Sequence, residues 1–478
     1  MKNNKIKEYR QFYMNGGWVD PISEDSIDVV NPATEEVVAR IGAGTVEDVT
    51  RAVVSARKAF NSFSETSKKE RVELLTEVRN LYKKRFNDIA EAIRSEMGAP
   101  GHLAFGAQTT VGLGHLKTAI RVLEQFEFEQ QREKFLIRYE PIGVCGLITP
   151  WNWPINQIVS KIAPAIASGC TILLKPSELS PISAHVIAEV IDEAGVPAGV
   201  FNLVDGFGPI VGEAMSAHPD IDMMSFTGST RGGVAVAKGS AETVKRVSQE
   251  LGGKSANIVL NDAALEKSVR DGVLACMENT GQSCNAPTRM LVPKERHQEA
   301  IEIAKEASES ITVGNPEDDQ TQLGPVISDV QFNKVQHLIQ SGIDEGAMLV
   351  TGGMGRPDGL SKGYFVKPTV FAEVTSDMSI FREEIFGPVL SISTYDDADE
   401  AVTIANDTPY GLAAYVSGED PAQLMHFARR LRAGQVHLNY TGGGTDAPFG
   451  GFKQSGNGRE KAEWGLEEFL ECKAILGN

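Results

Sequence analysis

The chain is short of cysteine and of long apolar runs. Its 478 residues include only five cysteines, an odd number without C-x-x-C spacing, which argues against a disulfide framework or a zinc ribbon and favours a reducing compartment. No uninterrupted apolar run reaches the length of about 18 residues that a membrane helix needs. The lysines near the N-terminus are not followed by an apolar segment, so a secretory signal is not predicted either. We expect a soluble, cytoplasmic protein.

Basic residues are also in the minority. The 46 Lys and Arg residues face 64 Asp and Glu residues, and the net charge of −18 repels phosphate backbones and anionic lipid. We therefore expect no nucleic-acid and no membrane partner. The hydrophobic fraction of 41% and the charged fraction of 23% are ordinary for globular proteins and exclude a disordered, collagenous or coiled-coil chain. The length fits two large domains with an extra element, or three units.

Glycine, in contrast, is abundant, and the 47 glycines cluster between apolar runs, as tight turns between strands and helices require. The spacing of apolar residues predicts helices over Val46–Phe60 and Lys68–Met97. From residue 142 onward, short β-branched runs alternate with helical stretches, which predicts a parallel, doubly wound sheet. The expected strands are Gly143–Ile148, Thr171–Leu174, Val200–Val204 and Met223–Phe226, separated by helices such as Pro181–Ala194 and Pro209–Ala217.

A second series of the same kind follows residue 255 and predicts a second α/β domain. Its strands are expected near Ala256–Leu260, Thr288–Val292, Ala347–Thr351, Val366–Phe371, Val389–Thr394, Ala413–Ser417 and Gln435–Asn439.

One segment interrupts the alternation between the helical region and the first sheet. Residues 122–140 contain the alternating stretch Phe126–Glu129 and the apolar run Phe135–Ile137, a pattern typical of a protruding two-stranded arm. An isolated hairpin is marginal in water, so the arm needs a partner, for which the strand-like tail Phe469–Leu476 is a candidate. The alternative is an edge hairpin packed on its own domain.

Two side chains are candidates for covalent and acid–base chemistry. Cys284 lies among small and polar residues just before an apolar strand, where a thiolate would be a strong nucleophile; a buried, inert cysteine is the alternative. Glu250 precedes Gly252 and Gly253, which let the backbone approach closely and leave the acid at the end of an element. It is a candidate general base, and a glutamate at a glycine-capped helix end is the alternative.

A third candidate is an amide. Asn152 lies between Trp151 and Trp153, with a proline on each side of this triplet. The prolines restrict the backbone and the tryptophans exclude water, so the amide would be a rigid hydrogen-bond donor in a site of low dielectric. A turn-forming asparagine is the alternative.

Two segments are candidates for binding an anion or a cofactor. The turn Phe226–Gly233 lies between a predicted strand and a predicted helix, so its backbone N–H groups could bind phosphate, although the G-x-G-x-x-G spacing is absent. Lys175 and Glu178 lie at the C-terminal end of a predicted strand, where open α/β sheets place ligand contacts. A solvated loop pair is the alternative for these two residues.

Taken in this order, the segments resemble the aldehyde dehydrogenase superfamily over nearly the whole chain. The resemblance is carried by Val30–Thr34, Pro150–Pro154, Lys175–Glu178, Phe226–Thr230, Glu250–Lys254, Gly281–Cys284, Glu384–Val389, Asn406 with Pro409–Leu412, and Pro448–Lys453 with Ser455 and Gly456.

The resemblance implies oxidation of an aldehyde to the carboxylic acid. Cys284 would attack the carbonyl to form a thiohemiacetal, whose oxyanion Asn152 and the Cys284 N–H would hold. Hydride transfer to the nicotinamide would leave a thioester, hydrolysed with Glu250 as general base and without a metal.

The resemblance also implies the cofactor contacts. Glu178 would accept hydrogen bonds from a ribose 2′-hydroxyl and repel a 2′-phosphate, which predicts NAD over NADP, although Lys175 partly offsets this repulsion. The implied cofactor-binding residues are Lys175 and Glu178 at the adenine ribose, Ser229 at the pyrophosphate, Glu384 at the nicotinamide ribose, and Phe386 and Trp151 near the ring. The implied substrate pocket consists of Trp153, Gln157, Ser283, Asn285 and Tyr440, and it predicts a medium-sized, oxygen-bearing aldehyde.

The expected fold is thus two doubly wound Rossmann-like α/β domains with a small β arm for oligomerisation. Residues 1–121 and 142–252 would form the NAD-binding domain, residues 253–454 the catalytic domain, and residues 122–141 and 455–478 the arm and the tail. The arm implies a homodimer or a homotetramer. Two alternatives are a CoA-acylating enzyme, against which the hydrolytic base Glu250 argues, and a catalytically silent NAD-binding structural protein, which would need no nucleophile.

Overall fold

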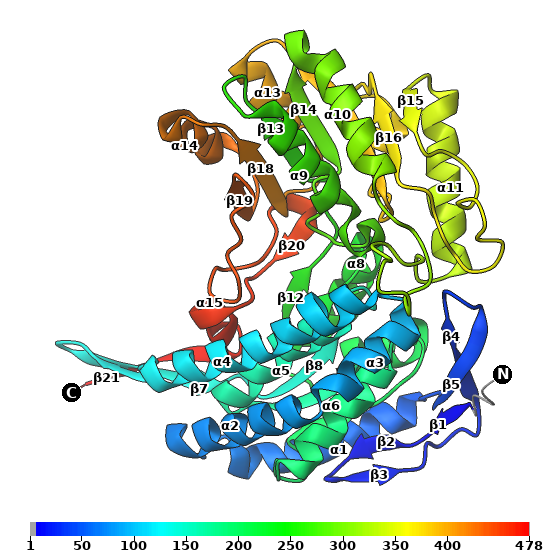
Figure 1. The fold of residues 1–478 in the computed structure, drawn as a ribbon. Coiled ribbons are helices and arrows are strands. Elements are labelled where there is room, and N and C mark those ends of the chain that lie inside the picture. The colour runs from blue at the N-terminus through cyan, green and yellow to red at the C-terminus, as the bar shows by residue number, and fades with distance from the viewer. Residues whose placement is uncertain (1–5, 478) are drawn as a thin grey trace.

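Two sheets, each covered by helices, organise the chain (Figure 1). The computed structural model describes residues 6–477, so the first five residues of the predicted NAD-binding domain and the last residue of the tail lie outside it. The seven-stranded sheet and its helices form the upper part of Figure 1, and the eight-stranded sheet with its helices forms the lower part.

The eight-stranded sheet has a parallel centre and antiparallel edges. Its central strands β8 and β9 are buried along their whole length, which is why they form continuous apolar runs in the sequence. In spatial order its strands are β20 (Gly456–Asn457), β12 (Arg246–Glu250), β11 (Met223–Thr227), β8 (Val144–Ile148), β9 (Thr171–Lys175), β10 (Phe201–Leu203), β2 (Phe12–Met14) and β3 (Gly17–Val19). The helices of this part are α1 (Val46–Phe63), α2 (Lys68–Lys84), α3 (Phe86–Met97), α4 (Thr109–Gln125), α5 (Pro154–Ser168), α6 (Ile182–Glu193), α7 (Glu213–Ala217) and α8 (Thr230–Ser240).

The seven-stranded sheet is parallel except for its edge strand β15. Its order is β15 (Met348–Thr351), β16 (Thr369–Ala372), β17 (Val389–Tyr395), β14 (Arg289–Pro293), β13 (Ala256–Val259), β18 (Ala413–Ser417) and β19 (Gln435–Leu438). Its helices are α9 (Leu265–Met277), α10 (His297–Glu309), α11 (Asp329–Asp344), α12 (Ser379–Arg382), α13 (Ala398–Asn406) and α14 (Pro421–Arg430). The predicted fold class, with two parallel sheets in an α/β chain, is confirmed. Within residues 6–477, no helix has both the length and the apolar character for a bilayer crossing.

The predicted arm is a three-stranded antiparallel sheet that extends away from the body of the molecule (Figure 1). It consists of β6 (Glu129–Gln131), β7 (Phe135–Pro141) and β21 (Leu470–Leu476). The tail is the partner of the hairpin, because β21 pairs with β7 from Leu470 opposite Pro141 to Leu476 opposite Phe135. Leu476 remains 77% exposed at the tip.

Several predicted elements differ from the structure. The single helix predicted over Lys68–Met97 is wrong, because Arg85 leaves the helical conformation (φ −94°, ψ 11°) and separates α2 from α3. The strand predicted from Val366 begins only at Thr369, directly after Pro368, which has no N–H for a ladder. The predicted helix Pro209–Ala217 begins as a π-helical turn and becomes α-helical at Glu213.

Other elements were not predicted at all. Strands β1 (Lys7–Tyr9), β4 (Ser26–Asn31) and β5 (Glu36–Gly42) form a small separate sheet, and β2, β3 and β12 join the eight-stranded sheet. Strands of three residues are too short to show a period, and β12 has the polar sequence Arg-Val-Ser-Gln-Glu. Within the residues predicted as tail, β20 joins the edge of the eight-stranded sheet and α15 (Ala462–Glu467) precedes β21.

Candidate active site

The nucleophile candidate lies on a sharply bent loop between α9 and β14. Asn279, Thr280 and Gly281 have φ of 54°, 58° and 70°, so the chain turns through the left-handed region in three successive residues. Gly281 is required there, because a Cβ at this position would collide with the carbonyl of Gly387. The bend brings Cys284 to a cavity, where its thiol is free and only partly exposed.

This cavity has a volume of about 200 Å³ and brings together residues from both sheets. Two of the predicted catalytic residues, Cys284 and Asn152, line it. The predicted cofactor residues Trp151, Ser229, Glu384 and Phe386 line it as well, as does the predicted substrate residue Gln157. The segments that meet here extend from Pro150 to Phe386 in the sequence, so the cavity exists only in the folded chain.

Both the side chain and the backbone of Asn152 are held in place. Its Nδ2 donates to the backbone carbonyl of Gln282 at 2.9 Å, and its backbone carbonyl accepts from Asn279 Nδ2 at 2.8 Å and from Gln108 Nε2 at 3.2 Å. Asn152 is therefore fixed directly against the loop that carries Cys284. The sequence prediction missed the three supporting amides: Asn279 and Gln282 lie beside Cys284 in the sequence, whereas nothing local indicates Gln108.

The surroundings of Cys284 strongly favour the protonated thiol over the thiolate. Burial, and then the nearby carboxylates of Glu384 and Glu250, raise the pKa of Cys284 to about 12, although the N–H groups of Cys284 and Asn285 lower it. The uncomplexed protein therefore holds a thiol rather than a thiolate near neutral pH.

Glu250 is the last residue of strand β12, so the alternative of a glycine-capped helix end is wrong. The side chain is 3% exposed, and neither carboxylate oxygen has a hydrogen-bond partner among the residues that the structure describes. Burial, and then the charge of Glu460, raise the pKa of Glu250 well above its ordinary value, and Lys161 and Arg459 lower it. A buried carboxyl group with free oxygens and a raised pKa has the properties of a proton acceptor.

A buried ion pair lies next to this acid. Lys161 on α5 donates a short hydrogen bond to Glu460 and a second one, at 3.0 Å, to Ser225 Oγ. The sequence prediction named neither partner. A signal for Lys161 was present, because it is the one charged residue of the otherwise apolar helix α5.

The cofactor candidates on the eight-stranded sheet lie at the C-terminal ends of its strands. Ser229 is the N-cap of α8, where its Oγ accepts the Gly232 N–H at 3.2 Å, and it lines the cavity at the start of this helix. Thr227, at the end of β11, also lines the cavity, and its buried hydroxyl has no partner within residues 6–477. At the end of β9, Lys175 Nζ lies 3.4 Å from Glu178 Oε2 and donates to the Pro176 carbonyl at 2.9 Å.

On the other side of the cavity, Glu384 and Phe386 follow α12. Glu384 Oε1 accepts the Gly253 N–H at 2.8 Å, and burial raises the pKa of this carboxyl group. The ring of Phe386 meets the Trp151 ring edge-on, with 5.4 Å between centroids. Helix α11 supports the segment, because Lys334 Nζ donates to the Glu384 carbonyl at 2.8 Å.

The other predicted substrate residues are not among those that line the cavity. Ser283 and Asn285 are the sequence neighbours of Cys284, and Trp153 contacts Ser283. Trp153 Nε1 donates to Ser283 Oγ at 2.8 Å, and the Asn285 carbonyl accepts the Tyr415 hydroxyl at 3.0 Å. Tyr440 is not among the residues that line the cavity: its hydroxyl donates to the Ser268 carbonyl at 3.3 Å, and its ring lies 5.7 Å from that of Tyr415.

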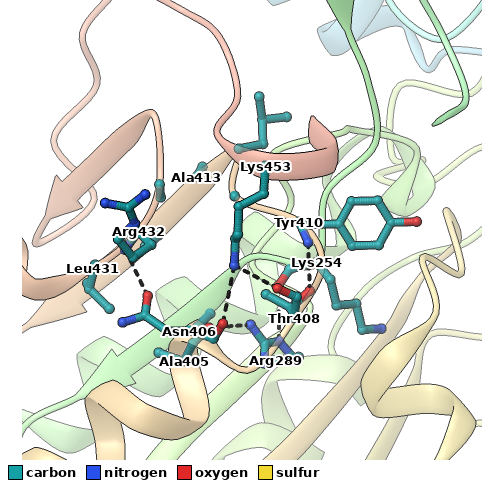
Figure 2. A pocket seen from close by; sticks show the side chains of 15 residues that line it. Lys254, Arg289, Ala405, Asn406, Thr408, Tyr410, Ala413, Leu431, Arg432 and Lys453 are labelled. Carbon is teal, nitrogen blue, oxygen red and sulfur yellow. Dashed lines mark hydrogen bonds between the residues drawn. The ribbon is translucent and has the colours of Figure 1, made fainter. Parts of the chain in front are cut away.

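Figure 2 shows a small second cavity next to Lys254. The motif residues Asn406, Tyr410 and Lys453 line it, and they support the backbone rather than take part in the chemistry. The buried Arg289 guanidinium donates to the carbonyls of Lys254, at 3.0 Å, and Ala405, at 2.7 Å. Lys453 donates to the carbonyls of Asn406 and Thr408 (Figure 2).

Ser455 completes this support by donating to the Gly252 carbonyl at 2.6 Å. These bonds hold the backbone that follows Glu250 and that contacts Glu384.

The comparisons with known proteins all lead to the same family and cover nearly the whole chain. Residues 18–475 match the model of the aldehyde dehydrogenase family. A 3-succinoylsemialdehyde-pyridine dehydrogenase of a Pseudomonas species is 52% identical over 99% of both chains. The crystal structure of a mutant aldehyde dehydrogenase C from Pseudomonas syringae, in complex with NAD+ and octanal, is 52% identical over 99% of both chains with a TM-score of 0.98. A Mycobacterium tuberculosis aldehyde dehydrogenase complexed with NAD+ is 37% identical over 99% of both chains with a TM-score of 0.97.

Proposed function

Because the chain belongs to the aldehyde dehydrogenase family, we propose that it oxidises an aldehyde to the carboxylic acid with NAD as the hydride acceptor. One observation carries the proposal: Cys284 and Asn152 meet at one cavity, and the carboxylate of Glu250 is buried nearby without a partner. The experiment that tests it is NADH formation by the purified protein with NAD and a panel of aliphatic, aromatic and semialdehyde substrates. Absence of NADH with every aldehyde would refute it.

The residues of the chain supply nucleophile, donors and base. The Cys284 thiol first gives its proton to solvent, and the resulting thiolate attacks the aldehyde carbon. The carbonyl oxygen becomes an oxyanion that accepts from Asn152 Nδ2 and the Cys284 N–H. The chemistry that bound NAD supplies is acceptance of the hydride from the substrate carbon, which leaves a thioester on Cys284. Glu250 then takes a proton from the water that attacks this thioester, and the carboxylic acid and the Cys284 thiol are released.

The cavity residues fit such a cofactor. The buried Thr227 hydroxyl has no partner in the described part of the chain, and a ligand hydroxyl or phosphate would satisfy it. The start of α8 at Ser229 favours a pyrophosphate, and Glu384 favours a ribose hydroxyl. Trp151 and Phe386 offer aromatic surface beside these groups. The NAD+ complexes of similar proteins support the same assignment.

Replacing Asn152 by alanine is expected to lower kcat by about 10²- to 10³-fold, because one of two oxyanion donors is lost. The exposed Asn87 on α3 offers a matched control, and Asn87→Ala should leave the rate unchanged. Steady-state NADH formation measures both variants. A kcat within a few-fold of the parent for Asn152→Ala would mean that this amide does not hold the oxyanion.

We expect NAD to be preferred over NADP. Glu178, next to Lys175 at the end of β9, would place a carboxylate against a 2′-phosphate, and this repulsion is only partly offset by the lysine ammonium. The value of kcat/KM measured with each cofactor tests this, and Glu178→Gln should narrow the difference because the amide keeps the shape without the charge. Equal or higher efficiency of the parent with NADP contradicts the assignment.

The arm supports assembly of the chain into a homodimer or homotetramer. Strand β21 completes an exposed three-stranded sheet whose outermost residues include the apolar Ile475, 41% exposed, and Leu476. A protruding apolar strand edge is a surface that another copy of the chain would cover.

The five free cysteines are consistent with a reducing, cytoplasmic compartment.

A further inference from the structure

One cation near the catalytic residues has no role in the chemistry described above. Lys461 follows Glu460, which exchanges two backbone hydrogen bonds with Phe449, at 2.9 Å and 2.7 Å. This pairing places Lys461 Nζ over the Phe449 ring, 4.9 Å from its centroid. The next residue, Gly450, lies directly against Glu250, since a Cβ at Gly450 would be 2.7 Å from Glu250 Oε1. The segment that lies against Lys461 therefore also contacts the catalytic base, and Lys461 and Glu250 interact electrostatically.

The backbone at Lys461 is strained. Its φ of 74° and ψ of 153° belong to a region that residues other than glycine rarely adopt. Glycine would adopt this conformation without the strain that a Cβ introduces. Strained backbone positions of this kind cluster at ligand sites, and here the strained residue is a lysine close enough to Cys284 and Glu250 to interact with them electrostatically.

The charge of Lys461 is not matched by a carboxylate. Its Nζ makes one hydrogen bond, to the Gly444 carbonyl at 3.0 Å, and no ion pair within residues 6–477 includes it. The neighbouring acids are already paired, Glu460 with Lys161 and Asp446 with Arg121. Burial lowers the pKa of Lys461, while Glu460, Cys284 and Glu250 raise it. An ammonium group with unused N–H donors and partial burial favours an anionic partner.

A small cavity lies beside this group, lined by Lys461 together with His115, Thr118 and Ser160. The loop between β19 and β20 contains Gly442–Gly444, and a Cβ at Gly442 or Gly444 would meet no atom within 4 Å. Bonds to α4 anchor the loop, since Thr445 Oγ1 lies 2.8 Å from Thr118 Oγ1 and Asp446 pairs with Arg121.

We propose that Lys461 is a specificity-determining residue that binds a carboxylate at the far end of the aldehyde substrate, so that the protein prefers ω-oxo carboxylates to neutral aldehydes. This inference rests on the proposed aldehyde oxidation. The aldehyde carbon lies at Cys284, and the substrate chain extends past Glu250 and Phe449 toward the Lys461 ammonium. A carboxylate there supplies the counterion that Lys461 lacks among the residues that the structure describes.

The test compares kcat/KM for ω-oxo carboxylates with that for unbranched alkanals of the same chain length. The parent protein should favour the oxo acids, and Lys461→Met, which keeps the length of the side chain without its charge, should reduce this preference by about 10- to 100-fold. The loss should appear mainly in KM, because the carboxylate is remote from the reacting carbon. Lys461→Arg should retain most of the preference, and added salt should weaken it in the parent.

Lys117→Met is the matched control, because Lys117 is an exposed lysine on α4 and its removal changes the net charge equally. Its preference for oxo acids should equal that of the parent. An unchanged preference in Lys461→Met overturns the inference, as does equal loss of activity with both substrate classes, which would make Lys461 a structural support of the Gly442–Gly444 loop. Absence of NADH with every aldehyde in the parent would instead refute the proposed oxidation itself.

Discussion

Replacing Cys284 by alanine is expected to abolish aldehyde oxidation, with a loss in kcat of ~10⁴-fold or more. The variant keeps the cavity and its aromatic walls but has no atom that can form the covalent adduct. Three of the other cysteines are buried elsewhere, and Cys472 lies on the arm, so none of them can replace the lost thiol. NADH formation with the best aldehyde of the panel measures the effect, and NAD binding measured separately should persist.

Cys472→Ala is the control for this substitution, since it removes an exposed thiol on β21 far from the cavity. Its activity should match that of the parent. If Cys284→Ala kept substantial activity while Cys472→Ala lost it, the nucleophile would be misassigned. The raised pKa of Cys284 adds a second readout: alkylation of the parent thiol by iodoacetamide should become faster as the pH rises toward 12.

Replacing Glu250 by glutamine is expected to separate the two halves of the reaction. The amide has the same shape but cannot accept the proton of the attacking water, so each site should form about one NADH in a burst and then turn over ~10²- to 10⁴-fold more slowly. In the parent, the pKa of Glu250 is raised, so the fraction of Glu250 that is ionised and can act as a base increases as the pH rises toward and past this pKa. The steady-state rate should therefore rise with pH in the parent and lose this dependence in the glutamine variant.

Rapid-mixing measurements of NADH resolve the burst from the steady state. Glu242→Gln, at an exposed position after α8, controls for the loss of one carboxylate. Loss of the burst itself would mean that Glu250 acts before the thioester forms. Restoration of full turnover by CoA, with an acyl-CoA as product, would favour the CoA-acylating alternative over hydrolysis.

The chain order of strands and helices was predictable because it depends on local patterns. Strands such as β8 and β9 are short, apolar and rich in β-branched residues, and they are buried on both faces as a parallel sheet requires. The arm was predictable for the same reason, since alternation over a few residues indicates a strand. Strand β12 was missed because its sequence Arg-Val-Ser-Gln-Glu is mostly polar, although its last three residues are buried.

The supporting residues of the site were not predictable from their surroundings in the sequence. Gln108 contacts Asn152 across 44 positions, and Lys161 meets Glu460 across 299 positions. Lys461 has no unusual neighbours in the sequence, yet its backbone is strained and its ammonium group lies over Phe449. Contacts between residues so far apart in the sequence do not produce a local hydrophobic pattern from which they could be predicted.

The sequence by itself determined the alternating α/β order, the absence of a disulfide framework and the types of reactive group that the chain can use: a thiol, an amide and a carboxylate. Only the tertiary structure decided that Cys284 and Asn152 share one cavity and that, within residues 6–477, the buried Glu250 carboxylate has no hydrogen-bond partner and Lys461 has no counterion. The physical reason is that pKa values and ion pairing depend on burial and on distances through space, which are set when remote segments of the chain pack together.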